Sequence, residues 1–150
     1  MEGETAKAAP LLAEAEKLAD ESQMAYQLPM IHELHAQLLL AEGKTDEADE
    51  RIRRSIGEAQ RQKMSSEEGI GLRLLGQIHA LRGESEEAMA LFGQSLHSLG
   101  EDPYETAHTQ MAWGKLLVER GETGAGQERI ATAGEIFARL GAKMAQTSQR

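Results

Sequence analysis

Cysteine is absent from this 150-residue chain, and aromatic residues make up only 3% of it. The lack of cysteine excludes disulfides, thiolate nucleophiles and cysteine-based zinc sites. Val118 is the only valine, and no sustained alternation of apolar and polar residues is present, so a sizeable β-sheet is not expected. Ala, Leu, Glu, Gln and Arg are abundant, and their side chains lose little rotamer freedom in a helix. The sequence therefore predicts an all-α protein.

A surplus of positive charge and a long apolar run are also missing. The net charge is −9, which disfavours nucleic acid and anionic lipid surfaces as partners. No apolar run approaches the 18 or so residues of a membrane span, and the acidic start differs from the basic and then apolar opening of a signal peptide. We expect a single cytoplasmic domain over residues 1–150, with no nucleic-acid or membrane partner.

A short pattern of glycine, charged residue and hydroxyl residue recurs along the chain. Its four copies are spaced by 40, 40 and 38 residues: Gly3-Glu4-Thr5, Gly43-Lys44-Thr45, Gly83-Glu84-Ser85 and Gly121-Glu122-Thr123. Glycine can adopt the left-handed conformation that ends a helix, and a Thr or Ser two residues later can cap the next helix. The pattern predicts a tight helix-helix turn at each glycine.

Small and large apolar residues follow the same register. Five positions after the first three glycines stand Ala8, Ala48 and Ala88, and four positions later come large apolar side chains, at Leu12, Ile52 and Phe92. Upstream of the last two glycines, a small residue lies within each apolar stripe, at Gly76 and Gly114. A small residue at such a position allows two helices to approach closely.

These residues resemble the tetratricopeptide repeat family, whose signature has a large residue, Leu, Gly or Ala and an aromatic in helix A, then Ala and Phe in helix B. The best match is formed by Leu72, Leu75, Gly76, His79, Gly83, Ala88, Phe92 and Pro103, and the resemblance covers residues 3–141. It implies a right-handed superhelix of tandem antiparallel helix pairs. The repeats here are about 40 residues long, against about 34 in the family. Gly126 stands where the family has Ala, and Ala36 replaces the helix A glycine.

Seven helices are expected, over residues 5–20, 23–42, 45–62, 67–82, 85–99, 104–120 and 123–140. The domain would comprise a half repeat (3–22), which opens on a helix B, and repeats at about 23–62, 63–102 and 103–142. This opening suggests a segment excised from a larger protein, such as a bacterial signalling or transcriptional regulator. Pro10 is expected to kink the first helix or to delay its start to about residue 9.

No catalytic, cofactor or metal site is predicted. His32 and His35 lie three residues apart on one helix face, but no third ligand accompanies them, and packing between helices explains His35 and His79 better. Gly69, Gly71 and Gly76 do not follow a strand as a phosphate-binding loop requires; we ascribe Gly76 to close packing and the other two to fraying at a helix start. The carboxylates are spread along helix starts and solvent faces, so no enzyme is expected.

The predicted function is binding of a peptide or protein surface in the concave groove that helix A lines in this family. The family register places twelve residues there: Met30, Glu33, Leu34, Gln37, Ile70, Arg73, Leu74, Gln77, His108, Met111, Ala112 and Lys115. Arg73, Gln77 and Lys115 are expected to point into one concavity, and Arg73→Ala to weaken binding while barely changing the melting temperature. Members that clamp a terminal carboxylate need Lys and Asn where Glu33, Gln37 and Gln77 stand, so that mode is disfavoured.

Three alternatives stay open. Arginines at helical spacing (Arg51, Arg54 and Arg61) are expected to form a solvated convex face, with an acidic partner as the second interpretation. The chain could instead form a homodimer through apolar end helices, which carry Leu11, Leu12 and Leu18 at one end and Ile136, Phe137 and Leu140 at the other. A regulatory domain that senses a small ligand or a signal peptide is the third.

Overall fold

The structure is a computed structural model that describes residues 2–21 and 24–148, and within these residues it consists of helices without a strand. Seven α-helices confirm the all-α prediction, and the single 3₁₀ turn (η1) was not expected. In chain order the elements are α1 (Glu2–Glu21), η1 (Ala25–Gln27), α2 (Leu28–Ala41), α3 (Thr45–Arg61), α4 (Ser65–Leu81), α5 (Ser85–Leu99), α6 (Pro103–Glu119) and α7 (Thr123–Ser148).

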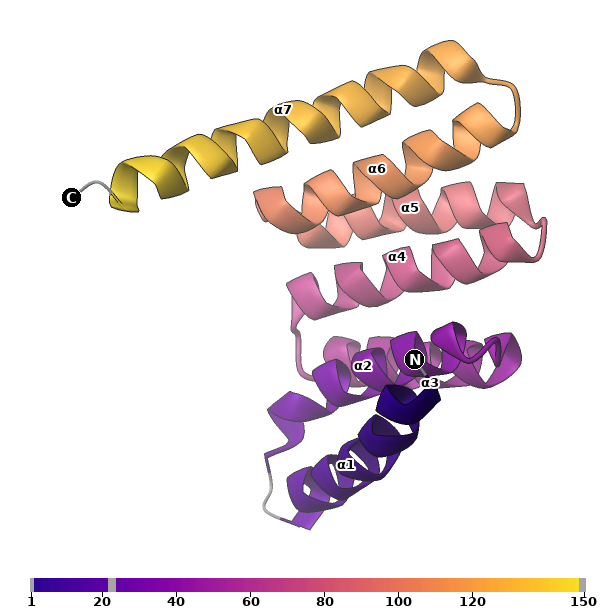
Figure 1. Cartoon of the computed structure of the whole chain (residues 1–150), viewed down its shortest axis with the longest axis vertical. Helices are drawn as coiled ribbons and strands as arrows, with labels where there is room; N and C mark the ends of the chain where they lie inside the picture. The colour runs from indigo at the N-terminus through magenta and orange to yellow at the C-terminus, as the bar shows by residue number, and fades with distance from the viewer. Residues whose placement is uncertain (1, 22–23, 149–150) are drawn as a thin grey trace.

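The helices are stacked in pairs along the long axis of the molecule, from α1 at one end to α7 at the other (Figure 1). Helix α2 packs on α3, α4 on α5 and α6 on α7, and α1 packs on α2. Contacts also join α2 to α4 and α4 to α6, so the first helices of successive pairs lie side by side. This is the arrangement of a helical repeat, whereas the right-handed superhelical sense stays a prediction.

Three of the four predicted glycine turns are present. Gly43, Gly83 and Gly121 have φ values of 77°, 77° and 88°, in the left-handed region that an L side chain rarely adopts. At the turn of Gly43, the Lys44 N–H donates to the Leu39 carbonyl at 2.8 Å. The Gly43 N–H donates to the Leu40 carbonyl at 3.0 Å. These two bonds form a Schellman motif, which satisfies carbonyls that the ending helix leaves free.

The expected hydroxyl caps are absent at two of these turns. Thr45 and Ser85 are themselves the first residues of α3 and α5, so Lys44 and Glu84 hold the cap positions, where no side chain accepts a hydrogen bond. The backbone bonds of the Schellman motif fix the turn without a cap. A side-chain cap does occur at the start of α6, where Asp102 accepts a hydrogen bond from the Glu105 N–H at 3.1 Å.

The predicted boundaries are wrong at both ends of the chain. Gly3 lies inside α1 and marks no turn, and Pro10 also lies inside that helix, which begins before it at Glu2. Eight residues of that helix precede Pro10, so its missing N–H removes one hydrogen bond of the helix interior. Helix α2 starts at Leu28, after η1, although residues 23–42 were predicted as one helix. Helix α7 continues to Ser148, beyond the predicted end at 140.

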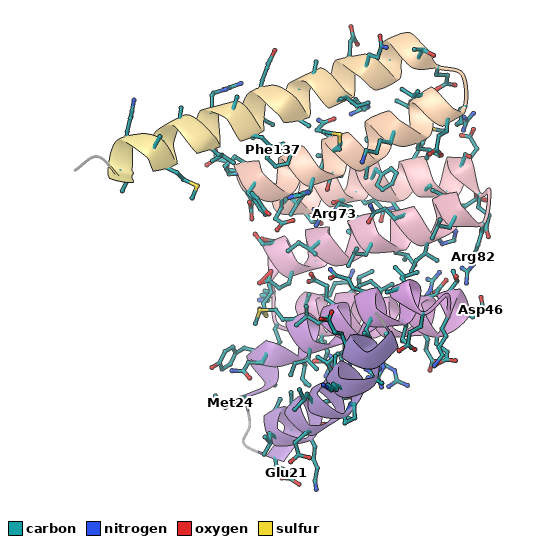
Figure 2. The ribbon with its side chains drawn as sticks, viewed as in Figure 1. Glu21, Met24, Asp46, Arg73, Arg82 and Phe137 are labelled. Carbon is teal, nitrogen blue, oxygen red and sulfur yellow. The ribbon has the colours of Figure 1, made fainter. Side chains whose placement is uncertain are left out.

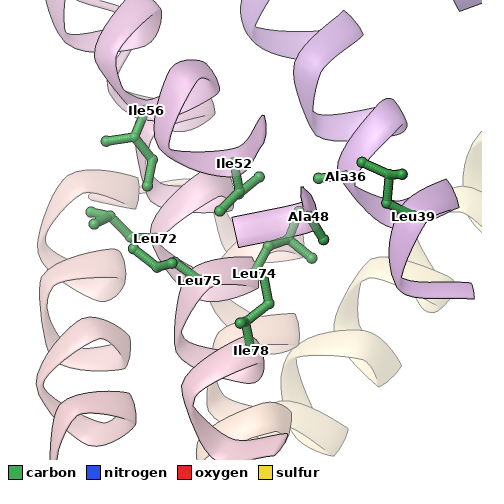
Figure 3. Packing of buried hydrophobic residues seen from close by; sticks show 9 residues of the cluster. All are labelled: Ala36, Leu39, Ala48, Ile52, Ile56, Leu72, Leu74, Leu75 and Ile78. Carbon is green, nitrogen blue, oxygen red and sulfur yellow. The ribbon is translucent and has the colours of Figure 1, made fainter. Parts of the chain in front are cut away.

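The central core follows the predicted register. Ala48 and Ile52 of α3 are fully buried, in a cluster with apolar side chains of α2 and α4 (Figure 3). Ala88 and Phe92 of α5 are buried in the equivalent way. A Cβ atom on Gly76 would lie 2.8 Å from Cε1 of Phe92, so a side chain there would force α4 away from α5. The close approach predicted for Gly76 is therefore confirmed.

Glycine has the same packing role at three positions where it was not predicted. A Cβ on Gly69 would lie 2.5 Å from Cγ of Leu99, and one on Gly71 would lie 2.7 Å from Cγ1 of Ile56. Both glycines are buried, so helix-end fraying was the wrong explanation. A Cβ on Gly126 would lie 2.6 Å from the carbonyl oxygen of Gly114, so α6 and α7 touch at a pair of glycines.

None of the described helices has the length and apolar content needed to cross a membrane.

Candidate functional site

The predicted groove residues lie on the side-by-side helices α2, α4 and α6, and we call this surface the α2–α4–α6 face. Five of its residues are exposed: Met30, Leu34, Gln37, Gln77 and Lys115. The exposed fractions of Met30 and Leu34 reach 40% and 53%, large for apolar side chains. Four more are half-buried: Glu33, Ile70, Met111 and Ala112. This surface is thus a mixture of accessible apolar and polar side chains.

Leu74 and His108, both predicted groove residues, are packed within the molecule. Leu74 is buried in the core cluster with residues such as Ile52 and Ile78, so its assignment to the binding surface was wrong. The His108 ring packs edge-on against Tyr104 at 4.6 Å and Phe137 at 5.1 Å between ring centroids. That aromatic group joins α6 to α7, and so His108 is held by packing.

Arg73, which is labelled in Figure 2, is an internal ion-pair residue rather than a free groove side chain. Its side chain is 11% exposed, and Nη1 lies 2.7 Å from Oε2 of Glu105, whose side chain is 17% exposed. The contact between Nη1 and Oε2 does not have the geometry of a hydrogen bond. Nη1 donates a hydrogen bond to the backbone carbonyl of Glu105 instead, at 3.1 Å. Arg73 therefore connects α4 to α6. The expectation that its replacement would leave stability unchanged does not fit this contact.

Carboxylates outnumber cations around Arg73. Burial raises the pKa of Glu33 to about 7, and the Glu105 and Glu67 carboxylates add to this effect, whereas Arg73 opposes it. The pKa of Glu67 is also raised, first by burial and then by Asp102 and Glu105. Glu67 and Glu105 are 38 positions apart, the spacing of the last two turn glycines, so the repeat register could have revealed this recurring carboxylate.

The raised pKa of Glu33 predicts a pH dependence of stability. Between pH 4.5 and about 7 the folded state binds more protons at Glu33 than the unfolded state, so the free energy of unfolding falls as pH rises. Glu33→Gln removes this loss, and should be more stable than wild type at pH 8 by up to about 3 kcal/mol. At pH 4 the difference should nearly vanish. Urea unfolding of both proteins at the two pH values measures it; an equal difference at both would contradict the assignment.

A hollow of about 360 Å³ lies between α4 and α6, and it brings Gln77 and Lys115 together. Arg73 does not line it, so only two of the three predicted side chains share a concavity. Five lining residues were not singled out from the sequence: Leu40, Ala80, Leu81, Leu116 and Glu119. Leu81 is 73% exposed, at the last position of α4 before the turn. A large apolar residue two positions before the turn glycine Gly83 was the available signal.

The three arginines that were predicted to form a convex face are compensated by carboxylates of the same chain. Arg51 lies 2.9 Å from Glu16, Arg54 lies 3.1 Å from Glu50, and Arg61 is paired with Glu58. Arg54 and Arg61 are exposed, as predicted, but the Arg51 side chain is only 22% exposed. Nearby, Arg82 binds Asp46 and Asp49 at 2.6 and 2.5 Å (Figure 2). This surface therefore holds little uncompensated positive charge for an acidic partner.

The candidate metal histidines are placed differently from each other. His32 is buried, and its Nδ1 lies 3.2 Å from Nη1 of Arg51, a geometry in which the ring nitrogen accepts. Burial, with help from the Arg51 charge, lowers the pKa of His32. His35 is half-buried, and its Nδ1 has no hydrogen-bond partner. Across the described part of the chain, no group of three or more His, Asp or Glu side chains is arranged to hold a metal ion.

The end helices expose only part of the predicted apolar residues. Leu11 and Leu18 of α1 are 71% and 53% exposed, whereas Leu12 is half-buried. On α7, Ile136, Phe137 and Leu140 are half-buried. Self-association through these ends stays a prediction.

Comparisons of the chain with protein families, curated proteins and solved structures found no match, so the tetratricopeptide resemblance also stays a prediction.

Proposed function

We propose that the protein is an interaction module that binds a peptide segment of another protein on the α2–α4–α6 face. The observation that carries this proposal is the hollow between α4 and α6, whose floor contains Phe92 and Leu116 and whose edge contains Gln77 and Lys115. Its volume of about 360 Å³ lies in the range of ligand pockets and suits one or two apolar side chains. A module of this kind would serve in a larger cytoplasmic regulator or scaffold.

The polar edge of the hollow supports recognition of a peptide backbone. The amide of Gln77 can both donate to and accept from a main chain, and the Lys115 ammonium can donate to a carbonyl or pair with a carboxylate. Neither side chain is engaged in an ion pair within the described residues, and both are exposed. Next along the face, Met30 and Leu34 offer apolar surface, and the flexible thioether of methionine adapts to different partners.

The test is selection of random 12-residue peptides displayed on phage against the full chain, followed by affinity measurements on variants. Leu81→Ser and Lys115→Ala should each weaken the selected peptides by about tenfold, the loss of a hot-spot contact. The melting temperature should stay unchanged because both side chains are exposed. Leu11→Ser is the matched control, since Leu11 is 71% exposed and Leu81 is 73% exposed, and it lies on α1, outside the hollow.

Two results would contradict the proposal. One is a set of selected peptides whose affinities are the same for wild type, Leu81→Ser and Lys115→Ala. The other is loss of affinity on Leu11→Ser alone, which would move the binding surface to α1.

A further inference from the structure

Arg129 of α7 lies in a setting unlike that of the other arginines. Its guanidinium carbon is 3.5 Å from the centroid of the Trp113 ring, a stacked cation–π contact. Its Nη1 donates one hydrogen bond to Oε1 of Gln110 at 2.8 Å. A guanidinium has five N–H donors, so most of its hydrogen-bonding capacity is unused by these contacts.

Among the residues that the structure describes, Arg129 has no carboxylate partner, although acidic residues outnumber basic ones by 25 to 16 in the chain. Every other arginine of the described residues has a carboxylate oxygen within 4.0 Å: Arg51, Arg53, Arg54, Arg61, Arg73, Arg82, Arg120 and Arg139. Arg129 is half-buried, and burial lowers its pKa. A partly desolvated, permanently charged guanidinium without a counter-charge is unfavourable, and an anion would relieve this cost.

The guanidinium borders a hollow of about 380 Å³ where α5, α6 and α7 meet. Met89, Trp113 and Leu117 give this hollow apolar walls, while Gln110, Thr132 and Arg129 are polar. Glu128 also lines it, but forms no ion pair with Arg129. The volume is enough for a small ligand or one side chain of a partner.

The hollow is separate from the α2–α4–α6 face. Gln110, Trp113 and Leu117 are spaced by three and four residues, so they share one side of α6. Met111 and Lys115, four residues apart, lie on another side of the same helix. A ligand in this hollow therefore leaves the proposed peptide surface free.

In the repeat register, Gln110, Trp113 and Arg129 stand where the preceding helix pair has an apolar contact. The turn glycines Gly83 and Gly121 are 38 positions apart, and the residues 38 positions before Gln110, Trp113 and Arg129 are all leucines, at Leu72, Leu75 and Leu91. In the preceding helix pair, Leu72 and Leu75 belong to the core and Leu91 packs against it. The last helix pair thus has an amide, an indole and a guanidinium where the other pair has hydrocarbon.

We propose that this hollow binds a carboxylate attached to an apolar body, with the carboxylate on Arg129 and the apolar part against Met89, Trp113 and Leu117. A planar carboxylate can accept two parallel hydrogen bonds from the guanidinium fork, the geometry for which arginine is best suited. The carboxylate can belong to a free organic acid or to an acidic side chain of a partner protein.

Trp113 is the only tryptophan of the chain and reports directly on its stacked neighbour. Titration of the full chain with hexanoate, followed by tryptophan fluorescence and calorimetry, should give a saturable response. Hexanol, which lacks the charge, and acetate, which lacks the apolar body, should bind at least tenfold more weakly. A blocked Leu-Glu dipeptide amide, compared with its Leu-Gln analogue, tests an acidic side chain as the source of the carboxylate. A stronger response to hexanoate indicates a free acid, and a stronger response to Leu-Glu indicates a protein side chain.

Arg129→Gln should lower the hexanoate affinity at least tenfold by calorimetry, and Arg129→Lys, which keeps the charge but loses the fork, should lower it less. Arg139→Gln is the matched control, because Arg139 is an exposed arginine on the same helix, and its affinity should equal that of wild type. Circular dichroism checks that each variant is folded. The proposal is overturned if neither acid binds, if hexanol binds as tightly as hexanoate, or if folded Arg129→Gln binds like wild type.

Discussion

Gly126→Ala is expected to lower the free energy of unfolding by about 2–4 kcal/mol, although alanine is the better helix former. The added methyl group would lie 2.6 Å from the Gly114 carbonyl oxygen and 2.9 Å from the backbone nitrogen of Val118. Both contacts are to backbone, which cannot rotate aside, so α7 would have to move away from α6. Urea unfolding followed by circular dichroism measures the change.

Gly134→Ala is the matched control on the same helix. Nothing lies within 4 Å of a Cβ at Gly134, so the substitution should stabilise α7 by about 0.5–1 kcal/mol. Opposite signs for the two variants would show that the α6–α7 contact depends on a glycine pair. Equal effects would contradict the close approach of these helices.

Arg73→Ala is expected to cost about 3 kcal/mol of stability, the order found when one partner of a buried ion pair is removed. Both side chains are mostly buried, at 11% exposed for Arg73 and 17% for Glu105. The truncation would also remove the Arg73 charge that holds down the pKa of Glu33, which burial already raises to about 7. Thermal and urea unfolding at pH 7 measure the loss.

Arg54→Ala provides the comparison, because Arg54 is also paired with a carboxylate but is 53% exposed, opposite a Glu50 side chain that is 69% exposed. Exposed pairs contribute little, so this variant should change stability by less than about 0.5 kcal/mol. A small effect of Arg73→Ala, similar to that of Arg54→Ala, would mean that Arg73 is free to act in the groove as the sequence suggested.

Features encoded by single residues were predictable from the sequence. Gly43, Gly83 and Gly121 adopt positive φ because only glycine does so readily. The small and large apolar residues that follow the first two in register are buried: Ala48, Ile52, Ala88 and Phe92. Gly69 and Gly71 were misread for the opposite reason. Their role depends on the distance to a side chain or backbone of another helix, which no local pattern records.

The candidate site was predictable in outline only. Gln77 and Lys115 do share a hollow, as predicted. The repeat register alone does not show that Leu74 points into the core or that Arg73 has an ion-pair partner on α6. Both outcomes depend on the rotation of α4 about its axis, and a few tens of degrees move a residue from groove to core. Arg129 was missed because its missing counter-charge is a property of three-dimensional neighbours.

Hydrogen–deuterium exchange of the full chain, with and without a peptide selected on it, tests the proposed binding face most directly. Added protection is expected in α4 and α6, centred on the segments around Gln77 and Lys115, since these helices border the hollow. Protection confined to α3, where Arg54 and Arg61 are exposed, would contradict it and place the binding surface on the opposite side of the helix stack.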